Sequence, residues 1–85
     1  MDLVNLTETI IKKLVTDPES VSVKEFETEE ENTIQIEVLI SADDMGRIIG
    51  KEGRIIRSIR EIIYAYAAKE GKKVSVDVEE QKENA

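Results

Sequence analysis

Apolar residues recur at steps of three and four positions in two parts of the chain, and this spacing predicts amphipathic helices. The first helix spans roughly residues 2–16, and its apolar face consists of Leu3, Leu6, Ile10 and Leu14, together with Val4, Ile11 and Val15. It ends at Asp17-Pro18, because the residue before a proline is pushed out of the helical region. The second helix runs from about residue 54 to 69 and stops before Gly71.

Strict alternation of apolar and polar residues predicts three strands. The clearest two contain Ile34, Ile36, Val38 and Ile40, and then Val74, Val76 and Val78. A further strand near residues 21–27 begins with Val21 and Val23, but Phe26 falls out of phase, which favours a bulge. Ser41 followed three residues later by Asp44 resembles a capping box and predicts a short helix over residues 42–49.

The resulting element order, αββααβ, predicts an α+β fold with a three-stranded sheet and helices packed on one face. We expect a single domain over residues 1–79 and a polar, frayed tail over residues 80–85. The longest apolar run, residues 62–68, is far shorter than the roughly 20 residues that span a bilayer. The N-terminus has no signal-peptide pattern, so we expect a cytoplasmic protein that does not enter membranes.

Composition narrows the possible chemistry. The chain has no cysteine and no histidine, which excludes disulfides, thiolate and imidazole metal ligands, and Ser-His or Cys-His nucleophile pairs. Its 19 carboxylates stand in no catalytic or metal-binding motif. An enzyme is therefore a distant third hypothesis, and we expect no cofactor, no metal and no small-molecule substrate.

Charge is distributed unevenly along the chain. The net charge is −7, yet residues 47–60 carry +4, which leaves −11 on the remainder. The basic residues of this stretch are Arg47, Lys51, Arg54, Arg57 and Arg60. A cationic stretch in an acidic protein is typical of an anion-binding site, although a basic helix face that pairs with nearby acids is an alternative.

The cationic stretch is interrupted by Gly50-Lys51-Glu52-Gly53, between the short helix and the long one. Glycine allows positive φ and lets the backbone approach a ligand closely. The long helix begins directly after this loop, and the start of a helix favours anions. With Arg47, Arg54 and Arg57 alongside Lys51, the combination suits a phosphate backbone.

Other glycine motifs fit less well. A nucleotide P-loop needs G-x-x-x-x-G-K-[ST], but the spacing from Gly46 to Gly50 is one residue short and Glu52 replaces the Ser/Thr. A dinucleotide fingerprint fails because Ile48 occupies the place of its second glycine. An ordinary turn between helices, capped by glycine, remains an alternative that explains one glycine but neither the pair nor the crowded basic residues.

The segment "IIGKEGRIIRSI" resembles the KH-domain core, in which an apolar pair precedes G-x-x-G and isoleucines follow at matching intervals. Over about residues 2–79 the chain is similar to the small stand-alone bacterial KH proteins of the KhpA (YlqC-like) family, with a type II KH arrangement. This resemblance implies single-stranded RNA binding, in which the loop clamps about four nucleotides, and a role as an RNA chaperone or post-transcriptional regulator. Carried over, Gly50 and Gly53 supply close approach and Lys51 supplies charge, whereas Glu52 departs from the basic or neutral pattern.

The resemblance also implies a partner, since the family commonly pairs with a larger KH-containing RNA-binding protein. The long helix has more apolar surface than one small sheet covers, which predicts a homodimer or heterodimer with Ile62 and Tyr66 as contact candidates. The alternative is that the first helix covers this surplus. A second functional hypothesis is a protein-interaction adaptor that keeps the KH fold without binding RNA, as the acidic surface and Glu52 would favour.

Overall fold

The computed structural model describes residues 2–82 and confirms the predicted α+β order. Its elements are α1 (Leu3–Leu14), β1 (Ser22–Glu27), β2 (Thr33–Ile40), α2 (Met45–Ile49), α3 (Arg54–Lys69) and β3 (Lys73–Glu80). Short 3₁₀ turns span Pro18–Ser20, Ala42–Asp44 and Lys51–Gly53. Within the described residues, none of the helices combines the length and apolar character needed to cross a membrane.

The sheet has the order β1-β2-β3, with β1 antiparallel and β3 parallel to the central β2. The parallel pairing follows from the connection through α2 and α3, which carries the chain back to the starting end of the sheet. Register is continuous along β1, with Val23 opposite Val38 and Phe26 opposite Gln35, so the expected bulge is wrong. Phe26 instead lies on the sheet face opposite to Val23 and stays 44% exposed.

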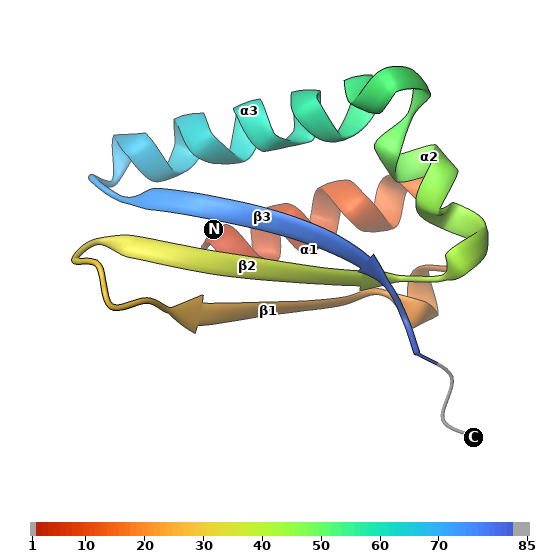
Figure 1. Cartoon of the computed structure of the whole chain (residues 1–85), viewed down its shortest axis with the longest axis horizontal. Coiled ribbons are helices and arrows are strands. Elements are labelled where there is room, and N and C mark those ends of the chain that lie inside the picture. Colours follow the sequence, from red (N-terminus) through yellow and green to blue (C-terminus); the bar gives the residue numbers. More distant parts are fainter. Residues whose placement is uncertain (1, 83–85) are drawn as a thin grey trace.

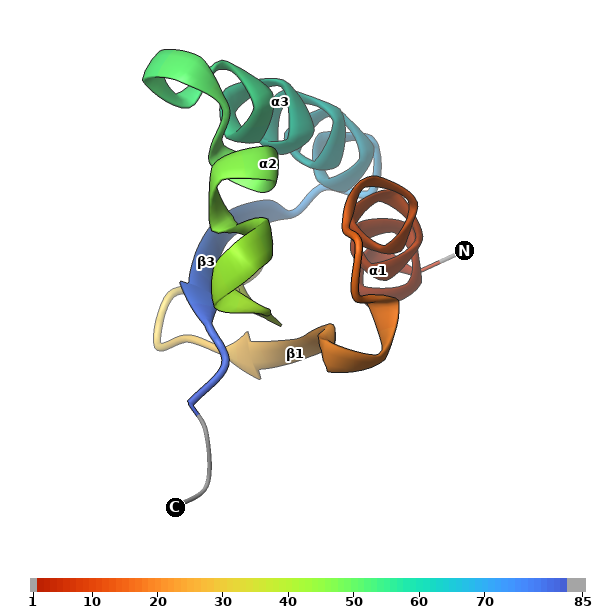
Figure 2. The same ribbon diagram turned by 90° about the vertical axis from the view of Figure 1, so that its right-hand side faces the viewer.

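All three helices lie on one face of the sheet, as predicted (Figure 1, Figure 2). The alternating strand residues that point to this face meet the apolar stripes of the helices and form a single core. The buried apolar residues are Leu3, Ile11, Ile36, Val38, Ile40, Ile48, Ile56, Ile59, Ile63, Ala67 and Val76. Helix α3 runs along the sheet above β3, so its first turn projects toward the end of the molecule that carries α2 (Figure 1).

Helix α1 buries part of the predicted apolar face together with one polar residue. Leu3, Thr7 and Ile11 are its buried residues, whereas Leu14 is 38% exposed. Thr7 tolerates complete burial because its hydroxyl donates a 2.8 Å hydrogen bond to the carbonyl of Leu3. The periodicity of apolar letters alone cannot reveal a polar residue whose hydrogen bond is satisfied within its own helix.

The C-terminal strand extends further than predicted. β3 continues to Glu80, and the backbone N–H of Gln81 donates a 2.7 Å hydrogen bond to the carbonyl of Ile40. The Gln81 side chain also donates to the carbonyl of Ser20 at 2.9 Å. The expected fraying is therefore wrong for Glu80 and Gln81, and residues 83–85 of the expected tail lie outside the described part of the chain.

Candidate nucleic-acid interface

The loop between α2 and α3 has an unusual backbone. Gly50 ends α2 with φ 75° and ψ 177°, a region that is essentially restricted to glycine. A Cβ at Gly50 would lie 2.6 Å from Cγ1 of Ile55, which is closer than real side chains approach. Gly50 is therefore required by the path of the chain, whatever the loop binds.

Gly53 and Glu52 also have a positive φ, but both lie in the left-handed helical region. Gly53 has φ 74° and ψ 17°, in the left-handed region, and a Cβ there would meet nothing nearer than 4.0 Å. Glu52 also has left-handed values, φ 57° and ψ 25°, which cost a non-glycine residue free energy. The loop thus places two partly exposed glycines on either side of the exposed Lys51 and Glu52, directly before α3.

Helix α3 begins without a side-chain cap from any described residue. The first N–H groups of an uncapped helix point outward and carry the positive end of the helix dipole. Four exposed basic side chains lie on the segments next to this point, namely α2, the loop and the first turns of α3: Arg47, Lys51, Arg54 and Arg57. All four basic residues of the predicted site are therefore accessible from solvent.

Most of these basic side chains have no acidic partner. Among the described residues, Lys51, Arg54 and Arg57 form no ion pair. Arg57 donates a 3.4 Å hydrogen bond to the backbone carbonyl of Glu52. The alternative interpretation, a basic helix face that pairs with nearby acids, therefore does not apply to these three residues. Their charge remains available to a ligand, with the exposed Glu52 carboxylate as the one opposing group within the loop.

Arg60 belongs to the same stretch of sequence but not to this cluster. Its Nε and Nη2 atoms donate hydrogen bonds of 3.0 and 2.8 Å to the carbonyl of Val76. Val76 lies in β3, an edge strand, so Arg60 covers part of an edge that would otherwise be unpaired. Its position in the sequence gave no sign of this structural role.

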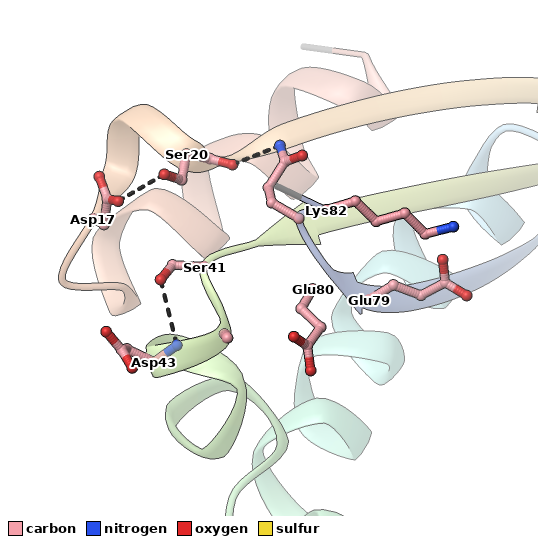
Figure 3. A pocket seen from close by; sticks show the side chains of 9 residues that line it. Asp17, Ser20, Ser41, Asp43, Glu79, Glu80 and Lys82 are labelled. Atoms are coloured by element: carbon pink, nitrogen blue, oxygen red, sulfur yellow. Dashed lines mark hydrogen bonds between the residues drawn. The ribbon is translucent and has the colours of Figure 1, made fainter. Parts of the chain in front are cut away.

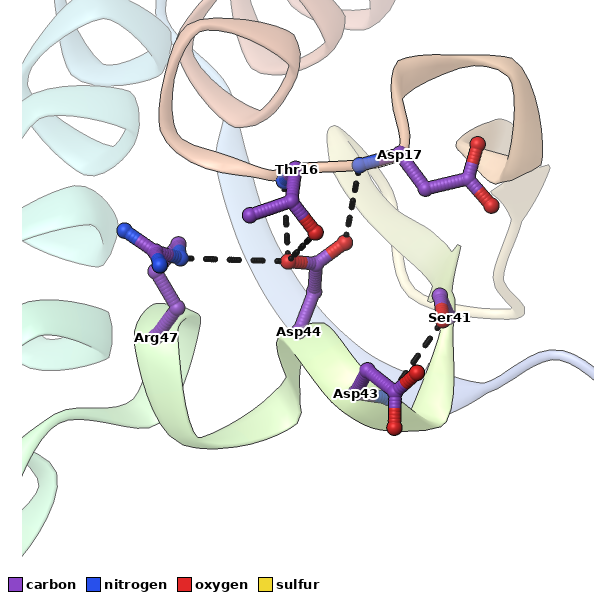
Figure 4. Close-up of polar contacts among 6 residues, drawn as sticks. All are labelled: Thr16, Asp17, Ser41, Asp43, Asp44 and Arg47. Carbon is purple, nitrogen blue, oxygen red and sulfur yellow. Dashed lines mark hydrogen bonds and ion pairs between the residues drawn. The ribbon is translucent and has the colours of Figure 1, made fainter.

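A buried carboxylate at the start of α2 has no signature in the sequence. Asp44 is fully buried, and it accepts hydrogen bonds from Thr16 N (2.9 Å), Thr16 Oγ1 (2.9 Å) and Asp17 N (3.1 Å) (Figure 4). The capping-box interpretation is therefore wrong for Asp44, because only Ser41 caps, through a 3.3 Å bond from Asp43 N. The Thr16 backbone N–H lowers the pKa of Asp44 most, with smaller contributions from the Thr16 hydroxyl, Asp17 N–H and Arg47, while burial opposes them.

A hollow of about 920 Å³ lies beyond α2, where β2 and β3 end (Figure 3). Its charged lining consists of Asp17, Asp43, Glu79, Glu80 and Lys82. Four carboxylates against one lysine repel a phosphate backbone, so this hollow is a poor continuation of the basic surface. No set of carboxylates within residues 2–82 converges closely enough to hold a metal ion.

The predicted contact candidates on α3 differ in their surroundings. Ile62 is 54% exposed, so α1 does not cover it. Tyr66 is half-buried against the core, and this burial raises the pKa of its hydroxyl, as does the neighbouring carboxylate of Glu70. The exposed apolar surface of α3 therefore comes from Ile62, Tyr64 and the 39% exposed Ile55 rather than from Tyr66.

Comparison with known proteins finds relatives that cover most of this chain. "RNA-binding protein KhpA" of Clostridium perfringens is 48% identical over 73 residues, covering 86% of this chain and 95% of the relative. The protein of the same name from Clostridium acetobutylicum is 45% identical over the same length and coverage. Among solved structures, Era in complex with MgGDPNP and a fragment of 16S ribosomal RNA shares the fold, with a TM-score of 0.64 at 19% identity. The match covers 92% of this chain but only 29% of the Era chain.

The family described as "KhpA/KhpB, KH domain" matches residues 4–78, nearly the whole of the described structure. That range contains the glycine loop, both helices that flank it, β1, β2 and most of β3. The chain therefore belongs to the KhpA/KhpB KH-domain family.

Proposed function

We propose that this chain binds single-stranded RNA through its phosphate backbone, at the Gly50–Gly53 loop and the start of α3. One observation carries the proposal: a positive-φ loop bounded by two glycines lies directly before an uncapped helix start, and the segments that flank it carry exposed basic side chains. The relatives named RNA-binding proteins support the same function. The chain acts as a binding module and not as an enzyme.

The residues divide the task by chemistry. Gly50 and Gly53 let the RNA backbone approach closely, since no Cβ holds it away. Lys51 provides a mobile ammonium within the loop, and the guanidinium groups of Arg47, Arg54 and Arg57 contact neighbouring phosphates. Glu52 weakens binding, because its carboxylate lies among these groups, so a single domain binds RNA only modestly.

We further propose that the protein acts in the cytoplasm as an RNA chaperone or post-transcriptional regulator, and that it does so as part of an assembly. The exposed Ile62 supports a contact through α3, either in a homodimer or with a larger KH-containing RNA-binding protein. Tyr66, half-buried beside it, forms the edge of that contact. A second binding surface would compensate for the modest affinity of one loop.

The second candidate function is a protein-interaction adaptor that uses α3 without binding RNA. The observation in its favour is the net charge of −7, which disfavours nucleic acid outside the loop region. The two functions differ in one respect that can be measured, because only RNA binding requires the charge of the loop.

The test replaces both central residues, Lys51→Asp with Glu52→Asp. Both side chains are exposed, and aspartate tolerates the left-handed conformation of position 52 better than glutamate does, so the fold should persist. The loop charge changes from zero to −2, where phosphate must lie. We expect RNA binding by fluorescence anisotropy to be lost while the circular dichroism spectrum and Tm stay close to the parent values.

The matched control is Lys24→Asp with Glu25→Asp, the same pair of residues exposed on β1, away from the loop. It changes the net charge equally and should retain binding. If the loop variant binds as well as this control, the loop is structural and the adaptor function takes first place.

A further inference from the structure

Asp44 is a buried carboxylate whose side-chain hydrogen bonds are all with residues outside α2. Its two carboxylate oxygens accept three bonds from Thr16 and Asp17, in the connection between α1 and β1. Burying a carboxylate is costly unless it is fully hydrogen-bonded, and here both oxygens are satisfied. These bonds tether the start of α2 to the α1–β1 connection, because Thr16 and Asp17 precede Asp44 by 28 and 27 residues.

Helix α2 depends on such a tether. It has five residues, far below the length at which a helix is stable by itself. Ile48 anchors one side in the core, and Asp44 anchors the start. The glycine loop follows directly at Gly50, so whatever fixes α2 also fixes where the loop begins.

Arg47 lies one turn after Asp44, within reach of the same carboxylate. Its Nε is 3.9 Å from Asp44 Oδ1, while its side chain remains 58% exposed (Figure 4). A guanidinium has five N–H donors in a rigid fork, so an attraction at Nε leaves the donors of both Nη atoms for another ligand. Arg54 and Arg57 have no comparable acidic partner among the described residues.

We infer that Asp44 is a positioning residue of the RNA-binding site, which holds α2 in place and orients the Arg47 guanidinium toward an RNA phosphate. This inference rests on the proposed function. Orientation raises affinity because an arginine that is already aligned loses less conformational entropy when it binds. Asp44 itself is buried and does not contact RNA.

Two simpler views predict different outcomes when Asp44 becomes neutral. If Asp44 acted only as a negative charge near phosphates, Asp44→Asn would tighten RNA binding by removing repulsion. If it acted only on stability, the folded variant would bind RNA as the parent does. Positioning alone predicts weaker binding by a folded protein, so the sign of the change separates the three.

The experiment is a double-mutant cycle on RNA affinity, measured with a fluorescent single-stranded RNA well below every Tm. Asp44→Asn should weaken binding about fivefold in the parent but less than twofold in the Arg47→Gln background, because the orientation of Arg47 then no longer matters. Tighter or unchanged binding, or an equal loss in both backgrounds, would overturn the inference. Thr7→Ala serves as a control, since it removes a buried hydrogen bond in α1 without touching α2.

A second measurement requires neither a variant nor RNA. In the free parent protein, the ¹⁵Nε order parameter of Arg47 should exceed that of Arg54, whose side chain forms no ion pair with a described residue, and equal values would refute the positioning role. This readout also separates the two proposals. If the parent binds no RNA, or if the Lys51 and Glu52 variant binds normally, the proposed function fails, while an ordered Arg47 would still support its orientation by Asp44.

Discussion

The side chain of Ile55 occupies the space that a Cβ on Gly50 would need, at 2.6 Å from Cγ1. Gly50→Ala therefore combines a steric clash with a backbone conformation that only glycine adopts readily, and we expect it to lower the free energy of unfolding by roughly 2–4 kcal/mol. Gly53→Ala meets no neighbour and has only the left-handed conformation to tolerate, so it should cost about 1 kcal/mol. Urea denaturation of the two variants checks this order.

Ile55→Ala provides the control for that comparison. Ile55 is 39% exposed, so its own truncation should be mild, and it removes the Cγ1 and Cδ1 atoms that block position 50. In this background Gly50→Ala should cost about 1 kcal/mol less than in the parent. An unchanged cost would assign the effect to backbone strain and to the Cβ of residue 55, which lies at 3.0 Å and remains in the alanine variant.

Glu52 combines two separable disadvantages, a left-handed backbone and a negative charge beside phosphate. Glu52→Asn relieves both, since asparagine adopts this conformation more easily, and should stabilise the protein by about 0.5–1 kcal/mol while tightening RNA binding. Glu52→Gln removes the charge alone. It should tighten RNA binding to a similar degree without raising the Tm, and a similar rise in Tm for both variants would contradict the role of backbone strain.

The elements of this fold could be predicted from the sequence because their periodicities are strong and local. Ile34, Ile36, Val38 and Ile40 alternate without a break, and Gly50 and Gly53 mark the loop by residue type alone. The family resemblance rested on the same local signals.

The errors concern residues whose surroundings come from distant parts of the chain. Asp44 fits a capping pattern within its own segment, yet its partners are Thr16 and Asp17. Arg60 belongs to the cationic stretch of the sequence but was not a predicted site residue, and its hydrogen bond to Val76 across the helix–sheet boundary has no signature in the sequence. No spacing rule reports these contacts, because they depend on which elements the sheet order brings together.

The hydrogen bonds that lower the pKa of Asp44 make its contribution to stability depend on pH. A carboxyl whose folded pKa lies below its unfolded value, ordinarily about 3.9, stabilises the fold above that value and loses this contribution as pH falls through the folded pKa. Asp44→Asn should therefore lower the Tm clearly at pH 7, and the difference from the parent should shrink below about pH 4.

Thermal melts at several pH values between 7 and 2.5 test this dependence. Thr7→Ala is the control, because it lacks a titrating group and its difference from the parent should stay constant with pH. A difference for Asp44→Asn that is equally constant would show that the buried carboxylate contributes through shape and not through charge.

Two arginines on α3 should respond in opposite ways to the same substitution. Arg60→Gln loses the paired hydrogen bonds to Val76, so it should destabilise the fold by about 1–2 kcal/mol and leave RNA binding unchanged. Arg57→Gln should leave stability nearly unchanged and weaken RNA binding.

The salt dependence of binding tests the same residue. If about three basic groups contact phosphates, the log–log salt slope of the parent should be near −2, and Arg57→Gln should reduce its magnitude by about 0.7. Equal slopes for Arg57→Gln and the parent would remove Arg57 from the interface.

The exposed Ile62 leads to the last prediction, which concerns assembly. Ile62 is 54% exposed on α3. Covering such an aliphatic side chain with a partner stabilises the complex by about 25 cal/mol per Å² of apolar surface that is buried. Ile62→Lys should therefore give a folded monomer by multi-angle light scattering. Ala68→Lys is the control, because it adds the same charge to an exposed position of α3 on a different side of the helix and should leave the assembly intact. If the parent is already monomeric at high concentration, a homodimer is excluded. The heterodimer is then tested by mixing the chain with a larger KH-containing protein. Ile62→Lys should abolish that complex, whereas Ala68→Lys should leave it intact.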